Sequence, residues 1–263
     1  MNKTFRDLLI LTGGFGAIWL AFVLVPWEMD EPGLEISVEK EMELGETMIK
    51  DWIFESGEMD VVSNPTLDSA MHIISDRLLE QLDSSEFNHH IWVVDQDEIN
   101  AFTLPGGYII VNQGLIKFSE HPEEVAGVIA HELGHVEERH VVSRLIKELG
   151  VAILFTALGG SDAILLNEVG RTAVSTAFDR SQEEEADEFA AALLQKANLD
   201  PRVLATFFRR LKNEHGYDER VEMFMTHPHH NARIKSALEI ELPEGFGSEP
   251  FEFDWERVKN SIQ

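Results

Sequence analysis

Residues 131–135 carry the clearest chemistry in the chain. They read His-Glu-Leu-Gly-His, with the two histidines four positions apart. On an α-helix, residues four apart are neighbours on one face, so both imidazoles can reach the same cation. Glu132 points to the side of that face and can reach a water molecule on the cation. Two imidazoles and an adjacent carboxylate at this spacing predict a zinc site that activates water.

The segment around this motif has the pattern of a buried helix. Pro122 lies where the first helical turn should be, and the acidic residues after it suit the positive end of the helix dipole. We expect the helix to run through His140 or beyond, which would put His140 on the face opposite His131 in a structural role. The alternative is an exposed helix on which these residues coincide by chance. Apolar residues around the motif favour the buried helix: Val125, Val128, Ile129 and Leu133.

A catalytic zinc needs a third protein ligand and one position left for water. The candidates lie in the acidic run Glu183-Glu184-Glu185-Ala186-Asp187. Glu183 and Asp187 are four apart and share a helix face, so one can bind zinc while the other accepts a hydrogen bond from a ligating histidine; we favour Glu183 as the ligand and Asp187 as the partner of His131. Glu184 and Glu185 have no such partner and are expected to be solvated.

In these and other blocks the chain resembles the family of zinc metallopeptidases that includes the CAAX prenyl endopeptidases, HtpX and BepA. The matching blocks span residues from about 35 to 240: Asn100-Ala101-Phe102, Pro105-Gly106-Gly107, Gly114-Leu115, His131 to Val136, Arg139-His140, Arg180 to Glu183, Ala186-Asp187, Thr226-His227-Pro228 and Arg233. One departure is Asp179, where family members usually have Ser. The resemblance implies one zinc per chain with His131, His135 and Glu183 as ligands and Glu132 as the general base.

The resemblance also implies roles for two residues near the C-terminus. In related enzymes the His of the His-Pro block lies at the metal. His227 would there stabilise the oxyanion or, in a closed state, occupy the open zinc position as an inhibitory fourth ligand. Arg233 would orient this segment through a carboxylate near the zinc.

Residues 100–111 predict two short strands joined through Pro105-Gly106-Gly107. An exposed strand edge here could bind an extended substrate by main-chain hydrogen bonds. The candidate substrate-binding residues are Asn100, Ala101, Phe102, Gly106 and Gly107. The alternative is an ordinary hairpin.

Composition narrows the class of protein and the N-terminus indicates its location. A formal net charge of −27 argues against nucleic-acid binding, and the lack of cysteine excludes disulfides and thiolate ligands.

Residues 8–27 form an uncharged apolar stretch long enough to span a bilayer. Basic residues precede the stretch and acidic residues follow it, which predicts an extracytoplasmic catalytic domain, periplasmic in a Gram-negative cell. A cleaved signal peptide is the alternative.

We therefore predict an α+β, mainly helical, zincin-like metallopeptidase domain with a small β-sheet, preceded by one transmembrane helix. The predicted parts are a cytoplasmic tail (1–7), the anchor (8–27), an acidic linker (28–42), the peptidase domain (43–242) and an acidic C-terminal tail (243–263). The expected function is zinc-dependent cleavage of unfolded or misassembled envelope proteins. Two alternatives are an assembly factor that binds unfolded proteins with gated proteolysis, and a structural zinc module with four protein ligands.

Overall fold

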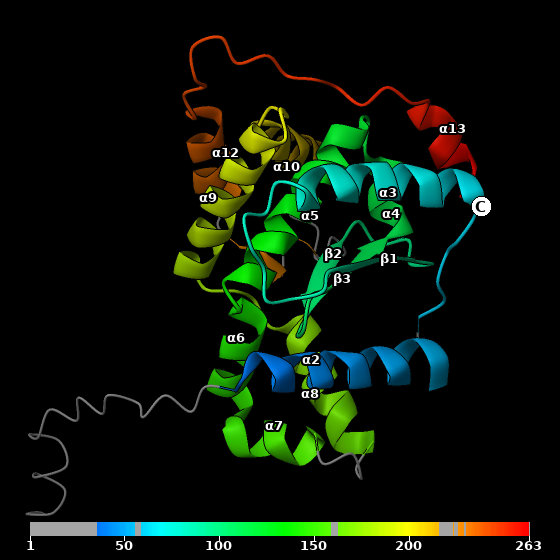
Figure 1. Cartoon of the computed structure of the whole chain (residues 1–263), viewed down its shortest axis with the longest axis vertical. Coiled ribbons are helices and arrows are strands. Elements are labelled where there is room, and N and C mark those ends of the chain that lie inside the picture. Colours follow the sequence, from blue (N-terminus) through cyan, green and yellow to red (C-terminus); the bar gives the residue numbers. More distant parts are fainter. Residues whose placement is uncertain are drawn as a thin grey trace, which may run out of the picture. The chain divides into compact units, whose positions relative to one another are not determined.

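The computed structural model describes residues 36–55, 59–158, 163–215, 223, 226–228 and 230–262. These residues form a mainly helical domain with one small three-stranded sheet (Figure 1). The predicted anchor at 8–27, the tail before it and the linker up to residue 35 lie outside the described residues. Within the described ranges, no helix combines the length and apolar character that crossing a bilayer requires.

Helices dominate the described chain. They are α2 (Val38–Ile49), the π-helix η1 (Lys50–Glu55), α3 (Pro65–Leu79), α4 (Gln113–Phe118), α5 (Pro122–Glu137), α6 (His140–Leu149), α7 (Val151–Leu158), α8 (Ala163–Ser175), α9 (Arg180–Lys196), α10 (Val203–His215), α12 (His230–Leu238) and α13 (Trp255–Asn260). The strands are β1 (His90–Val94), β2 (Ala101–Leu104) and β3 (Tyr108–Asn112).

The sheet has the order β1-β3-β2. β2 and β3 form the predicted antiparallel hairpin, with Ala101 opposite Val111, while β1 runs parallel to β3. Gly106 and Gly107 in the turn have φ angles of 81° and 92°, a region that residues with a side chain rarely adopt. These two glycines therefore allow the tight connection between the two strands.

Helices cover both faces of this sheet (Figure 1). Successive strand residues point to opposite faces. In β3, Ile109 and Val111 enter a core with α3, α5 and α10, whereas Ile110 enters a second core with α2, α6, α7 and α8. The sheet is thus buried on both sides, and α5 lies on one of those sides.

The domain extends beyond both predicted boundaries. Ile36 is buried and α2 begins at Val38, so the domain starts before residue 43. The C-terminal segment is not a separate tail, because α13 packs on α3 and Ile262 is buried in the same core. The indole Nε1 of Trp255 donates a hydrogen bond to the carbonyl of Ser119 at 2.9 Å. The apolar residues of an acidic segment thus complete the core around α3.

The helix that carries the His-Glu-Leu-Gly-His motif is shorter than predicted. It ends at Glu137, and Arg139 has a left-handed backbone with φ 53°. A new helix, α6, begins at His140. The expectation of one continuous helix through His140 was wrong, and the break changes the direction in which His140 points.

Candidate metal centre

Helix α5 places two histidines side by side in the core. His131 and His135 are 2% and 0% exposed, and their rings meet edge to face with centroids 4.7 Å apart. Their Nε2 atoms are 3.1 Å apart. Both atoms therefore face the same small volume, as the spacing of four on a buried helix predicts.

Helix α9 brings a carboxylate to this volume because α5 and α9 pack closely. A Cβ atom added at Gly134 would lie 2.9 Å from the Cα of Ala186, so only a glycine allows this approach. Glu183 is fully buried one turn before Ala186. Its Oε1 lies 3.5 Å from Nε2 of His135, and its Oε2 lies 3.7 Å from Nε2 of His131.

The start of α9 is fixed by a capping box. The Asp179 side chain accepts hydrogen bonds from the backbone N–H groups of Ser181 and Gln182, and the Gln182 side chain bonds back to the Asp179 backbone. Asp179, the residue that departs from the family pattern, therefore caps the helix that presents Glu183.

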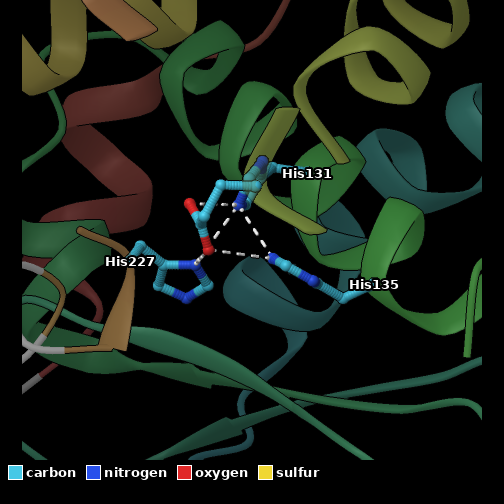
Figure 2. Close-up of side chains that lie close together, drawn as sticks. His131, His135 and His227 are labelled. Carbon is cyan, nitrogen blue, oxygen red and sulfur yellow. Dashed lines mark hydrogen bonds and ion pairs between the residues drawn. The ribbon is translucent and has the colours of Figure 1, made fainter. Parts of the chain in front are cut away.

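His227 completes a cluster of four donors. Its Nδ1 lies 2.9 Å from Oε1 of Glu183 and 3.3 Å from Nε2 of His131. Figure 2 shows the rings of His131, His135 and His227 directed toward one another. One ligand atom from each of the four residues falls within 4.8 Å of the others. The structure thus places a ring nitrogen of His227 in the same cluster as the ligand atoms of the other three residues.

Glu132 lies beside the cluster and is held by the sheet. Thr103 on β2 donates a hydrogen bond to Oε2 of Glu132 at 2.8 Å. The other oxygen, Oε1, is buried without a hydrogen-bond partner among the described residues and lies 3.4 Å from Nε2 of His227. One oxygen of Glu132 is therefore fixed, and the other faces the cluster.

Arg233 and Asp187 contact the cluster residues and stabilise their positions. Arg233 is 5% exposed and donates to both oxygens of Asp187 at 2.7 Å, and its Nη1 also donates to Glu183. Oδ1 of Asp187 lies 3.1 Å from Nδ1 of His131, the ring nitrogen that faces away from the centre. Removing one partner of such a buried ion pair typically costs about 3–5 kcal/mol. Arg233 thus holds both carboxylates in place.

The protonation states suit metal binding. Burial lowers the pKa of His135 well below its ordinary value, which leaves a ring nitrogen with a free lone pair. Burial raises the pKa of Glu183, but the charges of His227 and Arg233 outweigh it, so the net pKa lies well below the ordinary value. The same balance lowers the pKa of Asp187, where Arg233 opposes the effect of burial. A neutral His135 and an ionised Glu183 are the forms that zinc binds.

This donor set fits one zinc ion. Imidazole nitrogens and a carboxylate oxygen are ordinary zinc ligands, and sites with two His and one Glu occur in zinc peptidases. Buried atoms of the required kind converge here from α5, α9 and the segment before α12. His131, His135 and Glu183 could hold the ion, with His227 within reach of the fourth position.

The predicted substrate strand is buried by other parts of the chain. β2 lies at one end of the strand order, but all four of its residues are buried, and Asn100 is buried as well. Gly106 packs against the backbone of Met42 on α2, and Gly107 packs against the carbonyl of Asn88. The strand residues are therefore covered in this arrangement, and binding of an extended substrate along the outer edge of β2, the last strand of the order, stays a prediction.

Two contacts in the site carry no signal in the sequence. The ring of Phe178 stacks on His135 with centroids 3.7 Å apart, and the guanidinium of Arg144 lies 3.8 Å from the centre of the Phe178 ring. Burial lowers the pKa of Arg144 to about 10. Phe178 and Thr103 belong to residue types found throughout protein cores, so their positions become visible only in the fold.

Comparisons with known proteins agree with this site. The model of peptidase family M48 matches residues 65–241, which include every member of the cluster. The chain is 26% identical to the beta-barrel assembly-enhancing protease of Yersinia pestis, over 90% of this chain and 52% of the relative. It is 27% identical to the Escherichia coli K12 protein of the same name, over 78% of this chain and 44% of the relative. It is 36% identical to the mitochondrial metalloendopeptidase OMA1 of Arabidopsis thaliana, over 59% of this chain and 32% of the relative. The chain thus spans about half the length of the first two relatives and a third of the last.

Proposed function

Because the chain belongs to peptidase family M48, we propose that it is a zinc-dependent metalloendopeptidase that hydrolyses peptide bonds in protein substrates. The observation that carries this proposal is the buried convergence of His131, His135 and Glu183 beside Glu132. We place the domain in the zincin-like class, with His131, His135 and Glu183 as the zinc ligands.

The roles of the side chains follow from their positions. His131, His135 and Glu183 would hold zinc, which would supply an acidified water and polarisation of the scissile carbonyl. Glu132 takes the proton of the attacking water and returns it to the leaving amine, so its ionised form is the active one. Thr103 keeps the carboxylate of Glu132 from rotating, because it holds Oε2 while Oε1 faces the cluster. Arg233 keeps Glu183 and Asp187 ionised, and Asp187 keeps the Nδ1 proton on His131.

We further propose that His227 is a gate. A catalytic zinc keeps one position open, whereas a site with four protein ligands is closed. His227 lies among the donors in the described arrangement, where it would fill that fourth position. Its segment must then move away before a substrate carbonyl can enter. A purely structural zinc site would have the same four protein ligands. Catalysis requires that His227 can leave the fourth position.

The assay that tests the function is cleavage of unfolded casein by the zinc-loaded, full-length chain and by its His227→Ala variant. We expect the variant to cleave faster, by roughly tenfold if the open form is about one tenth of the wild-type population. His72→Ala is the matched control, because His72 is exposed on α3, away from the cluster. No cleavage by either protein would contradict the proposed enzyme. A loss of activity in His227→Ala would instead assign His227 to oxyanion stabilisation.

For the setting, we propose a single-pass membrane protein with residues 8–27 as the anchor and the domain outside the cytoplasm. The charge difference across residues 8–27 supports this orientation. The natural substrates would be unfolded or misassembled envelope proteins. The relatives named as enhancing β-barrel assembly support that class.

A further inference from the structure

The two histidines of α5 each have a second ring nitrogen that faces away from the cluster. In His131 this nitrogen meets the carboxylate of Asp187. In His135 it is Nδ1, and it lies 2.9 Å from Nδ1 of His140. We propose that His140 and Glu185 form a second positioning pair, which orients His135 as Asp187 orients His131. The inference rests on the proposed function, because it treats His135 as a zinc ligand.

The hydrogen-bonding capacities of the three groups fit only one proton arrangement. If His135 offers the lone pair of Nε2 to zinc, its proton must be on Nδ1. That proton can be donated to Nδ1 of His140, whose own proton is then on Nε2. Nε2 of His140 lies 3.1 Å from Oε2 of Glu185, which accepts it. The chain from Glu185 through His140 to His135 therefore fixes the tautomer that can bind the metal.

Each member of the pair is held in place. The side chain of His140 is 4% exposed, so water cannot readily replace its partners. The other oxygen of Glu185 accepts a hydrogen bond from Ser181 at 3.0 Å, which orients the carboxylate although half of the side chain is exposed. Glu185 is exposed, as predicted for it and Glu184, but its carboxylate also contacts His140 and Ser181, which the sequence did not indicate. Helix α9 contributes to the site through Glu183, Asp187 and also Glu185.

The backbone before His140 is bent so as to allow this contact. Arg139 adopts φ 53°, a conformation that residues with a side chain rarely take. Nε of Arg139 donates to Glu41 on α2 at 2.8 Å, and its Nη2 donates to the carbonyl of Ile36. Without this bend, a continuous helix would carry His140 away from His135. An uncommon backbone conformation with partly buried side-chain contacts, directly before a residue at the cluster, is the kind of feature found at functional sites.

A merely structural hydrogen bond would stabilise the fold without changing metal affinity, and this difference can be measured. The probe is zinc itself, in competition with a chromophoric chelator, using the full-length chain. His140→Phe keeps a ring of similar size but removes the acceptor, whereas His140→Gln keeps an acceptor. Glu184→Gln is the matched control for Glu185→Gln, because Glu184 is the exposed neighbour that pairs with Arg180.

We expect His140→Phe to weaken zinc binding by about 10–100-fold, the usual effect of losing such an outer partner. Glu185→Gln should weaken it less, His140→Gln should stay within about threefold of the wild type, and Glu184→Gln should not change it. The inference is overturned if His140→Phe binds zinc as tightly as the wild type, or if Phe and Gln weaken it equally. If His140→Phe does not fold, an unchanged zinc affinity in Glu185→Gln overturns it as well. Failure of the wild type to bind zinc would instead refute the proposed function.

Discussion

Glu132→Gln is expected to bind zinc and fold like the wild type while losing proteolysis by about a thousandfold. General acid–base catalysis contributes about 10²–10⁴-fold, and an amide cannot accept the proton of the attacking water. Gln has nearly the same shape as Glu, and its side-chain oxygen can still accept the hydrogen bond from Thr103. The loss should therefore fall on kcat while the zinc content stays at one per chain. Single-turnover cleavage of casein and metal analysis of the same sample measure both quantities.

Glu138→Gln is the matched control for this substitution. Glu138 lies at the C-terminal end of α5, is exposed, and is not part of the cluster. It should retain wild-type activity. Substantial proteolysis by Glu132→Gln would show that another group removes the proton, and the assignment of the base would fail.

The second large effect is expected for Glu183→Gln, which should lose zinc. Outer partners of ligands contribute about 10–100-fold to metal affinity, and removal of the only charged ligand should exceed that. The stabilisation by zinc should disappear too, because a ligand raises stability only when it binds the native state. The melting temperature of the wild type should rise when zinc is added, and that of Glu183→Gln should not.

Glu184→Gln, one position along the same helix, provides the comparison. Its side chain is exposed and forms an ion pair with Arg180 on the same helix. Zinc should raise its melting temperature as much as in the wild type. Equal loss of zinc in both variants would mean that charge along α9, and not coordination by Glu183, controls metal binding.

The features predicted correctly from the sequence depend on local periodicity. The spacing of His131 and His135 and that of Glu183 and Asp187 needs only a regular helix to bring each pair onto one face. The hairpin through Gly106 and Gly107 depends on turn chemistry, which is also local. These features could be predicted because the physics that decides them acts within a few residues.

The features predicted wrongly, or missed, depend on distant contacts. The left-handed Arg139 is held by Glu41 and Ile36, about a hundred positions earlier, so the helical repeat alone places His140 on the wrong side. The burial of β2 and the packing of Trp255 likewise require helices from elsewhere in the chain. The periodicity of a segment does not predict which distant parts of the chain will pack against it.

The most direct test of the zinc site is to return metal to a metal-free, full-length chain and follow the cleavage of unfolded casein. A single zinc held by the buried histidine pair of α5 and a carboxylate from α9 predicts that activity is absent without metal. It should then rise with each addition and reach its maximum at one equivalent of zinc per chain. Undiminished cleavage by the metal-free chain would contradict the account.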